Sequence, residues 1–206
     1  MTKLVVVSGG LREPSTTRLL ADRITASVVE QLEQQGVRPE TTVIELRRYG
    51  RAIIDAMLAG FPSTELEDVF GQVAAADGLI AVTPAFNASF SGLFKSFFDV
   101  LPEETLEDMP VLIGATGGTD RHSLVLEHAL RPMFSYLHAV VSPRGVYAAT
   151  DDFGAGDSAT RLGERIEKAA SDYVRMLRSC GVRTPRDPFG EDLAEMAHLL
   201  GNASAS

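Results

Sequence analysis

The segment VVVSGGLREPSTTRLLADRI, residues 5–24, runs from an apolar strand through two glycines into a helix that starts with serine and threonine. The glycine pair at 9–10 lets the backbone turn tightly directly after the strand. Residues 15–17 place hydroxyl and amide groups at the helix N-terminus, and Arg12 adds a guanidinium. A strand, a glycine turn and a helix start in this order favour an α/β protein that holds an anion such as phosphate at the helix N-terminus.

This turn matches neither of two common nucleotide-binding motifs. No Gly-Lys-Ser/Thr follows it, and Leu11 stands where the dinucleotide fingerprint G-x-G-x-x-G has its second glycine. A nucleoside triphosphatase and a standard NAD-binding turn are therefore disfavoured. Taken alone, the segment is explained equally well by Ser15 as a helix cap and Arg12 as a solvated loop residue.

Short apolar runs alternate with helical patterns along the chain. The runs LVVVS, TTVIEL, GLIAVT, VLIGAT and AVVSPRGVYA lie at residues 4–8, 41–46, 78–83, 111–116 and 139–148. The first, third and fourth are almost wholly apolar, as strands buried on both faces should be. The alternation predicts an α/β fold, specifically a flavodoxin-like three-layer α/β/α sandwich around a five-stranded parallel sheet in the order 2-1-3-4-5.

The helix predictions rest on apolar residues at helical spacing. The predicted helices span residues 15–35, 63–76, 90–101, 121–137 and 157–180. The apolar stripe of the first consists of Leu19, Leu20, Ile24, Val28 and Leu32. Gly36 then supplies a left-handed stop. Pro132 leaves the carbonyl of His128 without its usual N–H partner, which predicts a kink or a π-bulge near His128.

Composition bounds the class of protein. The 206 residues are 45% apolar and 23% charged, which predicts one globular domain, assigned to residues 1–182, and a partly flexible C-terminal extension, 183–206. The net charge of -9 argues against nucleic acid as a partner. Cys180 is the single cysteine, is expected to be buried or half-buried, and excludes an intrachain disulfide. No run approaches the roughly 20 apolar residues of a membrane span, so we expect a cytoplasmic protein with no membrane contact.

Two more loops follow strands at the same predicted edge. In TPAFNASFSGLFKSFFDVLP, residues 83–102, Pro84 is predicted to end the strand, and small residues beside Asn87 leave room for a planar ligand. Phe90, Phe94, Phe97 and Phe98 are expected in the core or a subunit contact, and for Phe86 the alternative to a ligand role is a place in the core. The other loop, ATGGTDRHS at 115–123, again permits close backbone approach through its glycines. Together with the first turn, these loops predict a ligand site at the carboxyl edge of the sheet.

These three segments also carry a family resemblance. SGGLREPSTTRLL, TPAFNASFSGLFKSFFDVLP and ATGGTDRHSLVLEHALRPM resemble the NAD(P)H-dependent FMN reductases of the flavodoxin-like superfamily. They are most similar to flavin reductases that serve two-component monooxygenases, including luciferase-like and alkanesulfonate systems. The resemblance covers about residues 3–180 and implies an oxidoreductase that uses FMN, with NADPH or NADH as hydride donor.

The resemblance implies an FMN site at the three loops. The implied cofactor-binding residues are Ser8, Arg12, Ser15, Thr16 and Thr17 around the phosphate, Pro84, Ala85, Phe86 and Asn87 along the isoalloxazine, and Thr116, Gly117 and Gly118 in the third loop. Many relatives have a serine where Gly10 stands, so we expect Ser8 or Thr16 to replace that hydroxyl. His128 matches an aromatic or histidine position in a helix that carries a π-bulge at a subunit interface. No catalytic side chain and no metal ligand are implied, because the flavin supplies the redox chemistry.

The implied function is hydride transfer from NADPH or NADH to FMN N5, with the reduced flavin passed to a partner monooxygenase. Two alternatives remain open: an FMN-retaining reductase of quinones, azo compounds or metal ions, and a non-enzymatic flavodoxin-like electron carrier. The resemblance also implies a homodimer or homotetramer, and the apolar run FSGLFKSFFDVL, 90–101, is consistent with cover by a second subunit. NADPH versus NADH, retention of FMN, the identity of the partner and the subunit number stay open.

Overall fold

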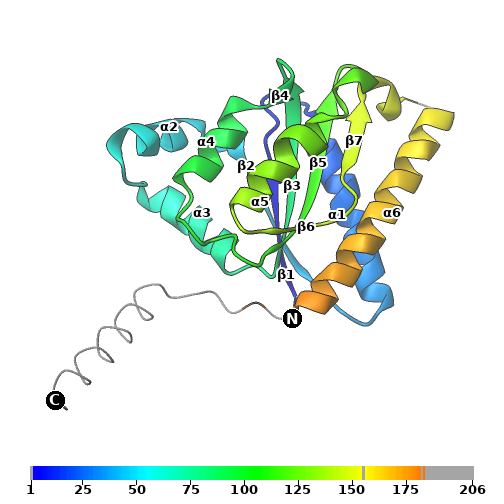
Figure 1. The fold of residues 1–206 in the computed structure, drawn as a ribbon, viewed down its shortest axis with the longest axis horizontal. Coiled ribbons are helices and arrows are strands. Elements are labelled where there is room, and N and C mark those ends of the chain that lie inside the picture. Colours follow the sequence, from blue (N-terminus) through cyan, green and yellow to red (C-terminus); the bar gives the residue numbers. More distant parts are fainter. Residues whose placement is uncertain (1, 155, 182, 184–206) are drawn as a thin grey trace, which may run out of the picture.

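A parallel sheet forms the centre of the fold (Figure 1), in a computed structural model that describes residues 2–154, 156–181 and 183. Its strands are β1 (Lys3–Ser8), β2 (Glu40–Glu45), β3 (Gly78–Phe86), β5 (Pro110–Gly117), β6 (Val140–Val141) and β7 (Val146–Ala149), and β4 (Ser89–Phe90) pairs antiparallel with β3. The order is β2-β1-β3-β5-β6. Strand β7 also pairs with β5, along the part of β5 that follows its pairing with β6. Because β6 and β7 together fill the fifth position, the predicted order 2-1-3-4-5 is confirmed.

The fifth strand differs from the prediction, which ran unbroken over 139–148. It is split by residues 142–145, where Pro143 has no N–H to donate to a ladder. The side chain of Arg131 supplies donors to the backbone here: Nη1 donates to the Ser142 carbonyl at 2.9 Å and Nη2 to the Pro143 carbonyl at 3.1 Å. Pairing with β5 resumes only at Val146.

Helices cover both faces of the sheet, as the three-layer prediction requires. On one face α1 (Thr16–Gln34) packs beside α6 (Asp157–Cys180) over the side chains of Leu4, Val6 and Ile80 (Figure 1). The other face is covered by α2 (Gly50–Ala59), α3 (Thr64–Ala74), α4 (Gly92–Val100) and α5 (Arg131–Tyr136). Short 3-10 helices lie at η1 (Leu46–Arg48), η2 (Asp120–His122) and η4 (Thr150–Phe153).

Two helix predictions are corrected by the structure. Leu19 is exposed, and the buried stripe of α1 consists of Thr17, Leu20, Ala21, Ile24, Val28 and Leu32. Helix α2 was missed, because it has no side-chain cap and buries only Ile53 and Ala56, so its apolar residues show no clear one-sided spacing. Gly36 does follow α1 with a left-handed φ of 78°, as predicted.

The predicted irregularity near His128 is confirmed. Residues Leu126–Leu130, η3, form a π-helix, in which the N–H of Arg131 donates to the carbonyl of Leu126. Within this turn Arg131 Nε lies 2.6 Å from Glu127 Oε2. The hydrogen bond from Arg131 lowers the pKa of the Glu127 carboxyl. His128 itself is exposed.

Helix α6 ends at Cys180, whose side chain is exposed and not buried as expected, because the last turn faces solvent. Beyond it, the guanidinium of Arg183 donates to the backbone carbonyls of Ala74, Ala76, Thr105 and Glu107. Residues 184–206 lie outside the described residues, so the boundary at 182 and the flexibility of the extension stay predictions. In the described part of the chain no helix is long and apolar enough to cross a membrane.

Candidate functional site

The three loops singled out in the sequence come together at the carboxyl edge of the sheet. The N–H of Gly9 donates to the Val82 carbonyl at 2.8 Å, which joins the first loop to β3. Pro84 at the end of β3 is in register with Thr116 on β5. Thr17 Oγ1 and Thr116 Oγ1 lie 2.8 Å apart and are both buried, so a hydrogen bond links the first loop to the third. The three loops are therefore neighbours at this edge.

The first loop ends in a helix N-terminus suited to an anion. Ser15 has extended backbone at the N-cap of α1, and its Oγ accepts from the N–H of Arg18 at 3.2 Å. The first N–H groups of a helix lack intrahelical acceptors and carry a partial positive charge. Arg12 is exposed and forms no ion pair within residues 2–154, 156–181 and 183. Its neighbour Glu13 is neutralised by Arg47 Nη2 at 2.5 Å, so the turn keeps its positive character.

The predicted phosphate residues divide into an outer and an inner group. Arg12 and Thr16 are exposed and Ser15 is half-buried, so their polar atoms can meet a ligand. Ser8 and Thr17 are buried. The Thr17 hydroxyl is hydrogen-bonded to Thr116, so Thr17 supports the site by holding the first loop in place.

Gly10 leaves the room that the Ser15 side chain occupies. A Cβ built at Gly10 would lie 2.1 Å from Ser15 Oγ and 3.2 Å from Thr17 Cβ. The Ser15 hydroxyl thus occupies the space that a side chain at position 10 would need. The expectation that Ser8 or Thr16 replaces a hydroxyl at the phosphate stays a prediction.

The second loop is a tight hairpin. Strand β3 continues through Pro84 to Phe86, so the prediction that Pro84 ends the strand was wrong. The strand tolerates the proline because its carbonyl keeps a partner, the N–H of Ser91 at 3.1 Å, and no donor is needed there. Asn87 and Ala88, with left-handed φ angles of 47° and 67°, form the two-residue turn into β4.

The side chains of this hairpin are graded in exposure. Pro84 is buried, Ala85 is half-buried and Asn87 is exposed. Phe86 is 46% exposed, so it is not the core aromatic that one interpretation of the sequence allowed. Farther along, Phe94, Phe97 and Phe98 are buried in the core on α4, as expected. The hairpin therefore offers one exposed ring beside small residues.

The third loop leaves β5 at Gly117. Thr116 is buried, Gly117 is half-buried and Gly118 is exposed, with open space where its Cβ would point. Its backbone lies directly over Tyr147 of β7, whose Oη donates to the Thr119 carbonyl at 2.6 Å. Sequence reasoning missed Tyr147, because only the pairing of β5 with β7 brings it under this loop.

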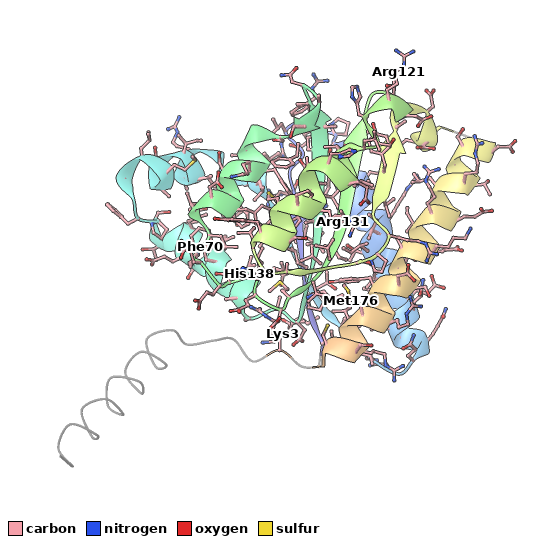
Figure 2. All side chains as sticks on the ribbon, in the orientation of Figure 1. Lys3, Phe70, Arg121, Arg131, His138 and Met176 are labelled. Atoms are coloured by element: carbon pink, nitrogen blue, oxygen red, sulfur yellow. The ribbon has the colours of Figure 1, made fainter. Side chains whose placement is uncertain are left out.

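Charges of both signs lie near the third loop, where Asp120 precedes Arg121 in η2. Figure 2 labels Arg121, which lies in η2 beside the third loop at the carboxyl edge, opposite Lys3 at the start of β1. Cavities of about 380 Å³ and 470 Å³ lie away from the three loops, and Glu104 and Glu107 line both. Those acidic cavities are poorly suited to a phosphate. No group of three His, Cys, Asp or Glu side chains able to hold a metal ion occurs among the described residues.

The residues present fit FMN. A capped helix N-terminus with an unpaired Arg12 and the Ser15 hydroxyl provides the donors that a phosphate needs. The Gly118 backbone and the Phe86 ring are both exposed, so both are accessible to a ring system. Fold and site together define a flavodoxin-like α/β protein in which a helix N-terminus able to receive an anion lies at the carboxyl edge of the sheet.

Comparison with known proteins gives the family. Residues 2–154 match the profile described as NADPH-dependent FMN reductase, and the chain belongs to this family, whose members use FMN with NADPH or NADH. The chain is 38% identical over 151 residues to "FMN reductase (NADPH)" of Pseudomonas aeruginosa, covering 73% of this chain and 78% of the relative. It is 38% identical over 175 residues to "NADH-dependent FMN reductase SfnE" of Pseudomonas putida, covering 84% and 91%.

A solved structure agrees. The chain superposes on an oxidoreductase from Corynebacterium diphtheriae with a TM-score of 0.83 at 42% identity, covering 87% of this chain and 98% of the other. The residues matched by the family profile, 2–154, include all three loops.

Proposed function

We propose that this chain transfers a hydride from NADPH or NADH to FMN and delivers the reduced flavin to a partner monooxygenase. The observation that carries the proposal is the convergence of the three loops, in which the Thr17–Thr116 hydrogen bond joins the anion-binding turn to the third loop. Membership of the FMN reductase family supports the reaction. The relative named as an SfnE reductase supports NADH as a possible donor, and the Pseudomonas aeruginosa relative supports NADPH.

The protein's own residues have a limited set of tasks. Arg12, Ser15 and the first N–H groups of α1 bind the FMN phosphate. The hairpin at Phe86 and the third-loop backbone at Gly118 orient the isoalloxazine ring. That ring supplies the redox chemistry when FMN is bound, so no side chain is required as an acid or base. We propose Ser8, Thr16, Thr17, Pro84, Ala85, Asn87, Thr116 and Gly117 as the rest of the site.

A homo-oligomer is part of the proposal, but the structure gives no support for residues 90–101 as the surface between subunits. The run at 90–101 packs its buried phenylalanines into the chain's own core, so it no longer argues for a second subunit. The most exposed apolar side chains lie in two places: Leu58 (83%) and Phe61 (70%) on and after α2, and Leu124 (60%) and Tyr136 (84%) on either side of the π-helix. Light scattering on the purified protein measures its mass and decides between a monomer and an oligomer.

The test is NADPH and NADH oxidation by flavin-free protein titrated with FMN, with FMN binding followed in parallel by flavin fluorescence. Saturable oxidation and loss of flavin on dialysis are expected for a reductase that exports reduced FMN. Flavin that survives dialysis, with rapid quinone reduction, would instead identify an FMN-retaining reductase. FMN binding without nicotinamide oxidation would identify an electron carrier, and no FMN binding would overturn the proposal.

A further inference from the structure

Tyr147 lies beneath the third loop in unusually close contact with its backbone. A Cβ built at Gly117 would be 2.1 Å from Tyr147 Oη and 3.1 Å from Cζ, so residue 117 has no room for a side chain. The same hydroxyl donates to the Thr119 carbonyl at 2.6 Å. One phenol therefore holds the loop at two places, by contact at Gly117 and by a hydrogen bond at Thr119.

The phenol is itself rigidly placed. Tyr147 is only 8% exposed, and its ring belongs to the buried cluster that covers the α5 face of the sheet. Its own carbonyl accepts from Arg165 Nη2 at 3.3 Å, and Arg165 also pairs with Asp152 at 2.8 Å. Asp152 Oδ2 in turn accepts from the N–H of Ala149 at 2.9 Å, which fixes the end of β7. The hydroxyl thus has little freedom to turn elsewhere.

The hydroxyl is also a permanent donor. Burial, followed by the negative charges of Asp120 and Asp152, raises the pKa of the Tyr147 phenol. The group stays protonated at neutral pH, and its proton is directed at the Thr119 carbonyl.

We propose that Tyr147 is a positioning residue for the flavin: it fixes the backbone of residues 117–119 so that this segment meets the isoalloxazine ring in one conformation. The inference rests on the proposed function, because it assumes that FMN occupies the site. The Tyr147 hydroxyl contacts the third loop, and in the proposed function that loop meets the flavin. It acts through that loop and takes no part in the hydride transfer.

The chain contains a matched control at the opposite end of the sheet. Tyr173 is fully buried, and its hydroxyl is shared between the carbonyls of Leu79 at 3.1 Å and Pro110 at 3.3 Å. A Cβ at Gly78 would be 2.4 Å from that Oη. Tyr173→Phe therefore removes the same kind of hydroxyl from under the same kind of glycine, at the start of β3 and far from the three loops.

The first experiment compares Tyr147→Phe and Tyr173→Phe with the wild type. In Tyr147→Phe we expect faster amide exchange at residues 116–119 in flavin-free protein and an FMN dissociation constant raised about two- to twelve-fold, the range for one lost hydrogen bond. The visible circular dichroism of bound FMN should also change, which a loss of stability alone would not produce. Tyr173→Phe should lower stability and leave all three readouts at their wild-type values.

A second experiment tests the steric contact. Gly117→Ala should abolish tight FMN binding, since its methyl group overlaps the Tyr147 hydroxyl. Adding Tyr147→Phe removes that oxygen and should restore part of the affinity. Tyr147→Phe behaving like Tyr173→Phe, or a double variant with purely additive losses, would overturn the proposal while leaving the reductase function intact. A wild-type protein that binds no FMN would overturn both.

Discussion

The hydrogen bond between Thr17 and Thr116 should be the main link between the anion-binding turn and the third loop. Both side chains are almost fully buried, at 3% and 4% exposure, and their oxygens are 2.8 Å apart. Valine has nearly the shape of threonine, so Thr17→Val removes the hydroxyl with little change in packing. It leaves the hydroxyl of Thr116 buried without its partner, which costs about 1–3 kcal/mol.

The magnitude is best measured as a coupling. Each single valine variant should lower the free energy of unfolding by about 1–3 kcal/mol, whereas the double variant leaves no buried hydroxyl unpaired and should cost less than the sum. The free energy of unfolding is measured by urea unfolding of the flavin-free protein, followed by far-UV circular dichroism, for the four proteins of the double-mutant cycle: the wild type, the two single variants and the double variant. The FMN dissociation constant of Thr17→Val should rise as well, because the two loops are no longer joined.

Thr25 provides the matched control. Its Oγ1 donates to the carbonyl of Ala21 at 2.7 Å on the same helix, so the bond is local and joins no loops. Thr25→Val combined with Thr116→Val should be additive within about 0.5 kcal/mol. If Thr17→Val and Thr116→Val are also additive, the two hydroxyls do not act as a pair and the reasoning is refuted.

Three further variants test the loop and the π-helix. Arg12→Ala should weaken FMN binding by about 1.5–3 kcal/mol, the scale for a charged hydrogen bond, while Arg38→Ala, an exposed arginine at the other end of α1, should leave fluorescence titrations unchanged. Gly10→Ser should displace the Ser15 cap, 2.1 Å from the new Cβ, and lower the unfolding free energy by about 0.5–2 kcal/mol. Adding Ser15→Ala should then cost nothing more, and additive losses would contradict the overlap. Glu127, whose folded pKa is lowered by its arginine partner, should stabilise the wild type over Glu127→Gln by about 0.3–0.5 kcal/mol at neutral pH, since the pair is exposed. This difference in unfolding free energy should begin to shrink near a pH of about 4.3, the usual pKa of glutamate, and should vanish once the pH is below the lower pKa of Glu127 in the folded protein. A difference that grows in acid would contradict the prediction.

Much of the fold follows from local sequence. The buried runs of β1, β3 and β5 are nearly all apolar because both of their faces are covered, and this pattern can be recognised without any knowledge of their neighbours. An irregularity near His128 was also predictable, since Pro132 has no N–H to continue regular pairing, whereas the choice of a π-helix at Leu126–Leu130 over a simple kink was left open. Helix α2 was not, because only two of its side chains are buried and the rest gave no periodic signal.

The candidate site divides in the same way. The sequence by itself determined that glycine-rich turns follow three strands and that Arg12 and Ser15 stand at a helix start, because backbone freedom and capping are local properties. Only the tertiary structure decided that Ser15 fills the space beside Gly10 and that Tyr147 lies under Gly117. Such contacts join residues that strand pairing and loop packing bring together, and no local pattern in the chain records which hydroxyl will meet which glycine.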